Sequence, residues 1–357
     1  MKAVILVGGQ GTRLRPLTCN IPKAVVPVLN RPFLEHLLIY LKSHDIDSIV
    51  LAMGYNPDPI RKTIGDGSHL GVQLTYIIEE SPLGTAGAVK NVEHLLDDTF
   101  IVFNGDIITE IDLTEMIRLH KEIKPKVSIA LTPVDDPTIY GVVETDEKNM
   151  IKRFVEKPSW DEVTTNMINA GIYIVDPDVL KRVPSSTPCM FERQLFPWLL
   201  DANEPMLSYK SGAYWIDIGT LEKYLKVHYD LLQAHPDYGV KIAGKGQIHT
   251  TAQIEGPVLI AEGCTIDTNA RIKGPAVIGP NCHVSHNALV ERSVLWQGAR
   301  IAEESVVKNC LLGANSYVES NLDLEDCVLG DDVTVEQRSE PYRNVKFWPE
   351  NCAESDN

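Results

Sequence analysis

The residues with the clearest chemical spacing lie near the start of the chain. An apolar run over residues 3–7 leads into Gly8-Gly9-Gln10-Gly11, and Thr12-Arg13 and Pro22-Lys23 follow. Glycines after a buried strand let backbone N–H groups approach phosphate oxygens, while Arg and Lys supply positive charge. The segment has neither the Gly-Lys-Ser/Thr end of a Walker loop nor the G-x-G-x-x-G dinucleotide pattern. These residues therefore indicate a phosphate site outside those two motif classes.

Two aspartates stand out as candidate ligands of a hard metal ion. Asp106 follows an apolar run and Asn104-Gly105, so on its own it is more typical of a turn than of a metal site. Asp217 lies inside the apolar run 215–219. A charge there is costly unless it is paired, hydrogen-bonded or bound to a metal. The pair gains its meaning only together with the motifs around it.

Residues 1–235 as a whole resemble the sugar-1-phosphate nucleotidyltransferase family, most closely its members that use GTP and mannose 1-phosphate. Besides the glycine segment, the resemblance rests on motifs in the family's order: Pro82-Leu83-Gly84-Thr85-Ala86-Gly87, Asn104-Gly105-Asp106, Tyr140-Gly141-Val142-Val143, Phe154-Val155-Glu156-Lys157-Pro158, Asn169-Ala170-Gly171-Ile172-Tyr173 and Trp215-Ile216-Asp217-Ile218-Gly219. Ala24 departs from the family, which commonly has proline there. We expect this change to affect the stiffness of the loop more than the chemistry.

The resemblance implies a reaction and a set of roles. A sugar 1-phosphate oxygen would attack the α-phosphorus of a nucleoside triphosphate, and pyrophosphate would leave in line. The nucleophile is already anionic, so alignment and charge neutralisation matter more than a general base. By resemblance the catalytic residues are Arg13, Lys23 and Asp106, and Mg²⁺ is held by Asp106 and Asp217. The nucleotide would contact Leu6, Gly8, Gly9, Gly11, Thr12, Glu79, Pro82, Gly84 and Thr85, and the sugar phosphate Gly141, Glu156, Lys157 and Asn169.

The choice of base can be argued from Glu79, which precedes the Pro-Leu-Gly turn. Relatives that use uracil or thymine tend to carry glutamine there, which both donates and accepts. A carboxylate only accepts, which suits the adjacent N1–H and N2 amino donors of guanine. The alternatives are that Glu80 faces the base or that Glu79 is an exposed charge at a strand end. For the sugar, mannose follows from the overall resemblance only.

The first 235 residues alternate β-rich runs with amphipathic helical stretches, which predicts an α/β fold with a Rossmann-like mixed or parallel sheet. The first strand would place the glycine segment at the ligand crevice of such a sheet. We expect strands at 3–7, 48–52, 73–78, 99–104, 127–132 and 170–175, and helices at 34–43, 86–95, 113–121 and 221–233.

Beyond residue 236 the hydrophobic period changes to six. The series runs through Ile248, Ile254, Ile260, Ile266, Ile272, Ile278, Val284, Val290 and Trp296, slips by one, and continues through Ile301, Val307, Leu312, Val318, Leu324, Leu329 and Val335. Three short strands per coil, each with one inward aliphatic residue, predict a parallel β-helix. Its left hand is implied by resemblance to the hexapeptide-repeat family. We therefore expect a catalytic domain at 1–235, a linker at 236–247, the β-helix at 248–338 and a tail at 339–357 that covers its last coil.

The composition of this chain of 357 residues limits the partners and the compartment that we expect for it. A net charge of −16 argues against nucleic acid as a partner, and the short apolar runs predict no membrane span. The seven cysteines are scattered without a C-x-x-C pair, so we expect neither a zinc site nor a disulfide framework, and a cytoplasmic setting. Stacked coils offer broad faces, from which we expect a homo-oligomer.

Three other functions remain open at this stage. The first is thymidylyl or uridylyl transfer to glucose 1-phosphate, against which Glu79 speaks. The second is a non-catalytic regulatory or assembly subunit, which loss of Arg13, Lys23, Asp106 or Asp217 would favour; all four are present. The third is acyl transfer by the β-helix, with His283 and His286 as bases, although the regular register leaves no room for a long inserted loop.

Overall fold

A computed structural model describes residues 1–9, 11–54, 57–234, 239–336 and 340–352. The chain forms two compact units. The first comprises Met1–Gly9 and Leu34–Asp217, and the second comprises Gln10–Phe33 and Ile218–Asn357. Gln10 of the predicted phosphate segment lies outside the described residues. Within the residues covered by the structure, we find no helix with the length and hydropathy of a membrane span.

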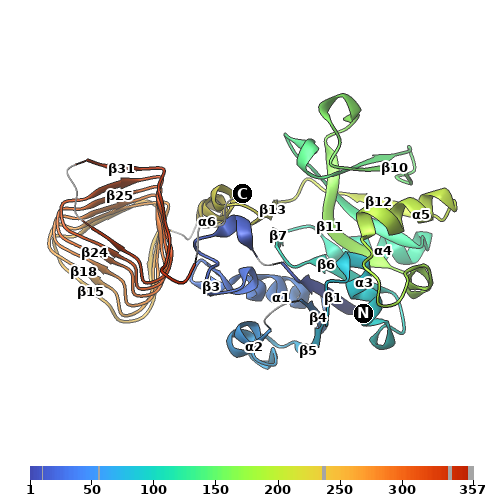
Figure 1. The fold of residues 1–357 in the computed structure, drawn as a ribbon, viewed down its shortest axis with the longest axis horizontal. Helices are drawn as coiled ribbons and strands as arrows, with labels where there is room; N and C mark the ends of the chain where they lie inside the picture. The colour runs from blue at the N-terminus through green and yellow to red at the C-terminus, as the bar shows by residue number, and fades with distance from the viewer. Residues whose placement is uncertain (10, 55–56, 235–238, 337–339, 353–357) are drawn as a thin grey trace. The chain divides into compact units, whose positions relative to one another are not determined.

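The first unit is built on a mixed sheet of nine strands (Figure 1). Strands β6, β1, β4 and β5 are parallel neighbours, whereas β11 runs antiparallel to β6 and to β8. The order is β10-β9-β11-β6-β1-β4-β5, with β8 on β11 and β12 on β8. The strands are β1 Lys2–Val7, β4 Ser48–Met53, β5 Gln73–Ile78, β6 Phe100–Asn104, β8 Val127–Pro133, β9 Gly141–Thr145, β10 Ile151–Glu156, β11 Met167–Val175 and β12 Met206–Lys210.

Helices and a short ribbon complete this unit. The helices are α1 Phe33–Ser43, α2 Asp58–Ile64, α3 Gly84–Asn91, α4 Leu113–Ile123 and α5 Phe196–Asp201, and the ribbon pairs β7 Ile107–Thr109 with β13 Trp215–Asp217. Helix α4 shows why such segments are helical. Asp112 caps its N-terminus by accepting from the backbone N–H of Glu115, and Lys124 ends it with a left-handed φ of 54°.

The α/β prediction is confirmed, and the predicted helices and strands of this unit are present. Helix α3 is shorter than expected, because it ends at Asn91 and a separate 3₁₀ turn covers Glu93–Leu95. The hairpin β9–β10 and strand β12 had no counterpart among the predicted elements. Their sequences mix polar and apolar residues without a regular alternation, so the period-two signal is weak.

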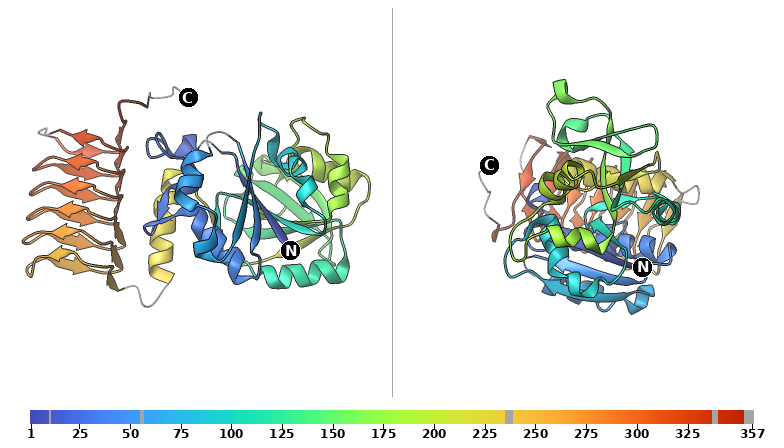
Figure 2. Two further views of the ribbon diagram at one scale, coloured as in Figure 1. Left: turned by 90° about the horizontal axis from the view of Figure 1, so that it is seen from below. Right: turned by 90° about the vertical axis from the view of Figure 1, so that its right-hand side faces the viewer.

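The second unit contains a parallel β-helix, shown as a stack of coils in Figure 2. Its strands form three parallel sheets of seven, six and six strands. This arrangement confirms the predicted β-helix and is consistent with its implied left hand. The sheets comprise β14 Val240–Ile242, β17 Val258–Ile260, β20 Ala276–Ile278, β23 Val294–Leu295, β26 Leu311–Leu312, β29 Val328–Leu329 and β32 Lys346–Phe347; β15 Gln247–Ile248, β18 Thr265–Ile266, β21 His283–Val284, β24 Arg300–Ile301, β27 Tyr317–Val318 and β30 Thr334–Val335; and β16 Gln253–Glu255, β19 Arg271–Lys273, β22 Leu289–Glu291, β25 Val306–Lys308, β28 Asp323–Glu325 and β31 Tyr342–Arg343.

One detail of the predicted register is wrong. The ladder pairs Leu295, not Trp296, with Ile278 and Leu312, and Leu295 is fully buried in the core of the stack. Trp296 instead packs outside the coil, where its indole N–H donates to the hydroxyl of Tyr224 at 3.0 Å. The five-residue step therefore falls one repeat earlier than predicted, between Val290 and Leu295, because a buried Trp at a corner looks like an inward residue in the sequence.

The coils extend past both predicted ends of the β-helix. Strand β14 lies in the segment assigned to a linker and pairs with β17 of the β-helix. Residues 236–238 of that segment lie outside the described part. Strands β31 and β32 belong to the segment assigned to a tail, whose residues 339 and 353–357 are likewise not described. The rings of Tyr342 and Phe347, with centroids 5.1 Å apart, lie on this last coil, so part of the segment expected to cover the last coil instead forms it.

The second unit also includes the segment 11–33 and helix α6 Leu221–Ala234, which the sequence analysis placed in the catalytic domain. The segment carries the short strands β2 Pro27–Val28 and β3 Arg31–Pro32. Asn30 donates to the carbonyl of Ile278 in the coil stack at 3.1 Å. Hydrogen bonds of this kind attach the segment to the β-helix over a sequence distance that local patterns do not reveal.

The expectation of no disulfide is corrected by the structure. Cys19 and Cys352 are joined by a disulfide, with Cα atoms 5.7 Å apart and a sequence separation of 333 residues. This Cα distance is ordinary for a disulfide. Spacing along the chain could not show the pair, because the two cysteines meet only through the fold. The other five cysteines are buried free thiols.

Candidate functional site

The candidate site of the first unit lies where its parallel strands end. The register aligns Val7 of β1 with Met53 of β4, and Met53 with Ile78 of β5. Gly8, Gly54 and Glu79 therefore follow these strands at one edge of the sheet. In open α/β sheets ligands bind outside the carboxyl ends of the strands. Gly54 was not among the predicted site residues, although its position after a buried strand repeats that of Gly8.

The backbone beyond β1 is open to a ligand. A Cβ atom built on Gly9 would have no heavy atom within 4 Å, and one on Gly8 would approach only the Gly54 nitrogen, at 3.9 Å. Leu6 is the predicted nucleotide contact within β1, and its carbonyl accepts from the Gly105 N–H at 3.0 Å. Gly105 needs to be glycine, since a Cβ would come within 2.5 Å of that carbonyl oxygen. This close approach fixes Asp106 relative to β1.

Glu79 is half-buried, whereas Glu80 is exposed. One carboxylate oxygen of Glu79 accepts from the backbone N–H of Leu83 at 3.0 Å. Burial raises the pKa of Glu79, and the hydrogen bond from Leu83 partly opposes that rise. One oxygen of the carboxylate is thus bonded to the turn at residues 82–84, and the second oxygen takes no part in the hydrogen bond to Leu83.

The turn after Glu79 is held by the segment around Cys189. Gly84 has a φ of +71°, and a Cβ there would lie 2.7 Å from the carbonyl oxygen of Cys189. The same carbonyl accepts from the N–H groups of Ala86 and Gly87, at 2.9 and 3.0 Å. These two amides at the start of α3 therefore already have a protein acceptor. The helix start is a rigid support for the turn.

Glu192, which the sequence analysis did not single out, is hydrogen-bonded among the predicted site residues. One of its oxygens accepts from the hydroxyl of Thr85 at 3.1 Å, and the other accepts from the hydroxyl of Tyr173 at 3.0 Å. Tyr173 in turn accepts from the side-chain amide of Asn169 at 2.8 Å. Glu192 thus links Thr85, predicted to contact the nucleotide, with Asn169, predicted to contact the sugar. The π-helical turn Phe191–Leu195 that carries it is a common feature of functional sites.

Asn169 is positioned by a distortion of β11. Its side-chain oxygen accepts from the backbone N–H of Gly171 at 2.9 Å, and the pairing of β11 with β8 shifts register between Asn169 and Tyr173. Gly171 has a φ of +73°, and a Cβ there would lie 2.6 Å from the Asn104 amide nitrogen. The Asn-x-Gly spacing was the available sequence signal for this bulge.

The hairpin β9–β10 brings together two more of the predicted sugar contacts. Gly141 and Glu156 are Cα partners, and a Cβ on Gly141 would lie 2.9 Å from a carboxylate oxygen of Glu156. Burial raises the pKa of Glu156, and the negative charge of Glu192 adds to the rise. Lys157 follows with a left-handed φ of 52°, and its backbone N–H donates to the carbonyl of Tyr140 at 2.9 Å.

The two predicted metal ligands lie at the same end of the β7–β13 ribbon. Asp217 is the Cα partner of Ile107, the residue directly after Asp106. The hydroxyl of Tyr140 donates to Asp217 at 2.5 Å. Across the described residues, His, Cys, Asp and Glu side chains nowhere gather in threes suited to hold a metal ion. A pair of carboxylates still fits Mg²⁺, because this ion commonly takes one or two carboxylates and completes its shell with waters and substrate phosphates.

The predicted phosphate residues of the second unit lie on a tight loop. Gly11 has a φ of +66°, a Cβ there would lie 3.0 Å from the Lys23 Cβ, and its carbonyl accepts from the Thr18 hydroxyl at 2.7 Å. Thr12 and Arg13 begin a 3₁₀ turn and are exposed. Lys23 is half-buried and begins a second 3₁₀ turn. Gly11 thus brings the start of the loop against Lys23.

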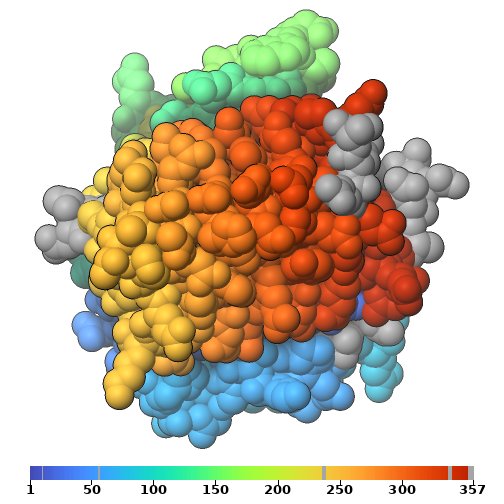
Figure 3. Space-filling view, turned by 90° about the vertical axis from the view of Figure 1, so that its left-hand side faces the viewer, coloured from blue at the N-terminus to red at the C-terminus, as the bar shows by residue number. Residues whose placement is uncertain are grey.

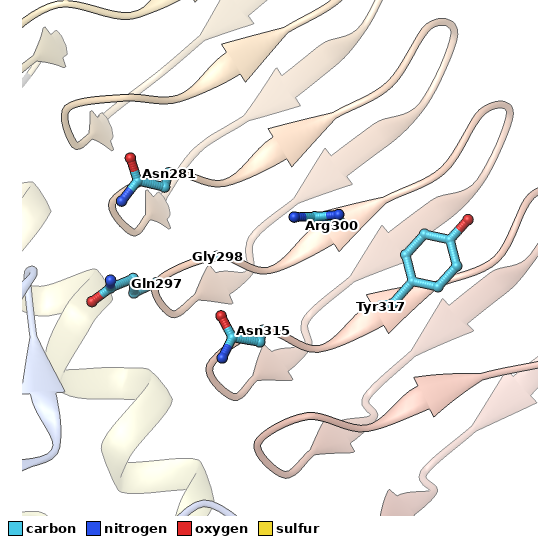
Figure 4. Close-up of a pocket in the computed structure, with 6 residues that line it drawn as sticks. All are labelled: Asn281, Gln297, Gly298, Arg300, Asn315 and Tyr317. Carbon is cyan, nitrogen blue, oxygen red and sulfur yellow. The ribbon is translucent and has the colours of Figure 1, made fainter.

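A separate cavity of about 480 Å³ lies on the β-helix (Figure 4) and is lined by Asn281, Gln297, Gly298, Arg300, Asn315 and Tyr317. None of the predicted site residues lines it. Figure 3 shows an outer face of the coil stack, coloured from yellow at the first coils to red at the last. The Nε2 atom of His283, a candidate base for acyl transfer, lies 2.7 Å from a carboxylate oxygen of Asp267, and both side chains are partly exposed.

Comparison with known proteins places these features in a family. The family model for nucleotidyl transferases matches residues 2–234, and that of the GMPPB C-terminal domain matches residues 254–340. A mannose-1-phosphate guanyltransferase of Candida albicans is 39% identical over 355 residues, which cover 96% of this chain and 94% of the relative.

Solved structures support the same assignment over 64% of the chain. HddC from Yersinia pseudotuberculosis, complexed with GMP-PN, is 32% identical with a TM-score of 0.56, and the match covers 64% of this chain and 99% of that one. A putative glucose-1-phosphate thymidylyltransferase from Bacillus anthracis is 27% identical with a TM-score of 0.59, over 64% of this chain and 94% of that one. From its two family matches and its full-length relative, the chain belongs to the nucleotidyl transferase family and is an enzyme of that class.

Proposed function

We propose that the enzyme transfers GMP from GTP to mannose 1-phosphate, giving GDP-mannose and pyrophosphate. The observation that carries this proposal is the similarity to a mannose-1-phosphate guanyltransferase across both domains, at 39% identity over 96% of the chain. The half-buried carboxylate of Glu79 beside the Pro82–Gly84 turn supports guanine, because it offers acceptors to the two adjacent donors of that base.

We assign binding roles to the residues as follows. The backbone of Gly8, Gly9 and Gly11 approaches the triphosphate, and Arg13 and Lys23 neutralise its charge. Leu6, Thr12, Pro82, Gly84 and Thr85 shape the nucleotide side. Gly141, Glu156 and Asn169 hold sugar hydroxyls, and Lys157 binds the sugar phosphate. The hydroxyl of Thr85 is bonded to Glu192, so we assign Thr85 a shaping role rather than a phosphate contact.

In this proposal an anionic oxygen of mannose 1-phosphate attacks the α-phosphorus of GTP, and the bond to pyrophosphate breaks on the opposite side. Lys23 stabilises the charge that develops around the α-phosphate and the leaving group. Asp106 and Asp217 would hold a divalent ion, consistent with the typical use of such ions in this family; when bound, it supplies positive charge to the phosphates. Tyr140 orients the Asp217 carboxylate through their 2.5 Å hydrogen bond.

A second candidate function is thymidylyl transfer to glucose 1-phosphate, which the name of the B. anthracis relative favours. A test of both is to measure pyrophosphate release with Mg²⁺ while crossing GTP, dTTP, UTP, ATP and CTP with mannose 1-phosphate and glucose 1-phosphate. Release confined to GTP with mannose 1-phosphate supports the first function. A preference for dTTP with glucose 1-phosphate supports the second, and no release with any pair would favour the regulatory subunit.

We further propose that the chain forms a homo-oligomer through the first coil of the β-helix. Strands β14, β15 and β16 each end their sheet, so one edge of each has no neighbouring strand among the described residues. Val240 and Ile242 are 45% and 46% exposed there. A second copy of the same coil would cover these apolar side chains and strand edges.

A further inference from the structure

The disulfide between Cys19 and Cys352 closes a junction inside the second unit. It joins the segment 11–33, which carries Arg13 and Lys23, to the chain that follows the last coil. Both cysteines are half-buried, whereas the remaining five are buried. Among the seven cysteines, this pair is therefore the more exposed to solvent.

Hydrogen bonds around the disulfide show that the two segments are fitted to each other. The side chain of Asn351 donates to that of Asn20 at 2.8 Å, and Asn20 donates to Asp331 at 3.3 Å. Asp331, which is 9% exposed, also accepts from the backbone N–H of Ala314 at 2.8 Å. The contacts thus run from the coil stack through Asn20 to the C-terminal segment.

Close packing at Gly330 makes the same junction tight. A Cβ on Gly330 would lie 2.6 Å from Pro349 and 3.3 Å from Pro16. Both prolines flank the disulfide, one before Cys19 and the other before Cys352. Thr18, next to Cys19, donates its hydroxyl hydrogen to the carbonyl of Gly11 at 2.7 Å, so this packed junction is bonded directly to the start of the segment 11–33.

We propose that the Cys19–Cys352 disulfide is a reversible redox switch on the phosphate-binding segment. A dithiol reductant attacks one sulfur as a thiolate, and its second thiol then resolves the mixed disulfide. The dithiol is oxidised to a disulfide, while Cys19 and Cys352 gain two electrons and two protons as free thiols. Oxidation by a disulfide of the same class runs these steps backwards. Reduction releases the C-terminal segment and loosens residues 11–23.

The effect on turnover rests on the proposed function, because it assumes that Arg13 and Lys23 bind the nucleotide. Loosening their segment raises the KM for GTP by about 5-fold or more, the range of an ordinary coupling between two sites. The KM for mannose 1-phosphate changes less, because none of the residues assigned to the sugar phosphate lies in the segment 11–33.

The first test maps the bond without any activity measurement. The full-length protein is equilibrated with oxidised or reduced dithiothreitol, its free thiols are alkylated, and the digest is analysed by mass spectrometry. We expect a Cys19–Cys352 cross-linked peptide in the oxidised sample and two alkylated cysteines in the reduced one, with re-formation on reoxidation. Alkylated Cys19 and Cys352 in the oxidised sample would overturn the proposal.

The second test measures hydrogen exchange and GTP kinetics in both states, with Cys352→Ser as the matched variant that cannot form the bond. We expect faster exchange over residues 11–23 and 348–352 on reduction, and no response of Cys352→Ser to dithiothreitol. Unchanged exchange, or an equal response of the variant, would refute the switch. Changed exchange in a protein that releases no pyrophosphate would instead refute the proposed function and leave the switch standing.

Discussion

At the scale of single residues, the proposed function assigns the choice of base to Glu79. Glu79→Gln replaces one acceptor by a donor, so an N–H group would face one of the guanine donors. We expect kcat/KM for GTP to fall by about 10- to 100-fold and the relative use of UTP and dTTP to rise. Steady-state kinetics with each nucleotide measure this. Glu80→Gln, a change at the exposed neighbour, should leave the preference as it is; equal effects of both variants would contradict the role of Glu79.

The raised pKa of Glu79 predicts a pH dependence of nucleotide binding. As the pH falls, a carboxyl group with a raised pKa takes up its proton before ordinary carboxyl groups do, and the protonated form loses an acceptor. The KM for GTP should therefore rise as the pH is lowered, beginning at a higher pH than the one at which ordinary glutamates take up protons. Because GTP itself titrates, the profile of Glu79→Gln is the reference. Parallel profiles would show that Glu79 does not read the base as a carboxylate.

Glu192 is expected to support both substrate sides at once. Glu192→Gln leaves an N–H group against one of the two hydroxyl donors, Thr85 or Tyr173. An unsatisfied pair of this kind costs about 1–3 kcal/mol of the free energy of unfolding, which chemical denaturation measures. The KM values for both substrates should rise together. Glu204→Gln, at an exposed ion pair with Arg182, is the control, and a variant that changes one KM alone would contradict the link.

At the scale of elements, the turn before α3 should tolerate no side chain at Gly84. Gly84→Ala combines a left-handed φ of +71° with a clash against the Cys189 carbonyl. Gly71→Ala is a matched control, because its φ is +73° and its nearest contact is the flexible end of Lys42 at 3.4 Å. Gly71→Ala should lower the free energy of unfolding by about 1–2 kcal/mol, and Gly84→Ala should lower it by about 1–3 kcal/mol more. Equal losses in denaturation experiments would mean that the segment at Cys189 moves freely.

The sequence predicts an element when a local pattern of residues marks it, and fails where the feature depends on residues far apart in the chain. The parallel strands are continuous apolar runs, and the coils repeat at a fixed period, so both were predicted. Trp296 was predicted to point into the coil in place of Leu295, because the hydrophobic pattern does not show which of two adjacent apolar side chains points inward. The Cys19–Cys352 bond and the link through Glu192 join residues far apart in the chain, which no local pattern shows. The roles of Asp106 and Asp217 came from resemblance, since each aspartate alone fits a turn or an ion pair.

At the scale of the whole molecule, self-association should depend on the first coil. Ile242→Glu places a charge on the exposed aliphatic edge of β14 and should dissociate the oligomer, because burying an unpaired charge is costly. Light scattering after gel filtration measures the mass. Ile123→Glu, at an isoleucine of α4 with the same 46% exposure, is the control. An unchanged mass for Ile242→Glu would place the interface elsewhere.

The most direct test of guanylyl transfer to mannose 1-phosphate follows the oxygen atoms. The enzyme is given unlabelled GTP, Mg²⁺ and mannose 1-phosphate whose phosphate oxygens are ¹⁸O, and the products are analysed by mass spectrometry and ³¹P NMR. If the sugar phosphate attacks the α-phosphorus, the label appears in GDP-mannose, including the oxygen that bridges its two phosphates, and the pyrophosphate is unlabelled. Labelled pyrophosphate, or label that never enters a sugar nucleotide, would contradict the proposed reaction.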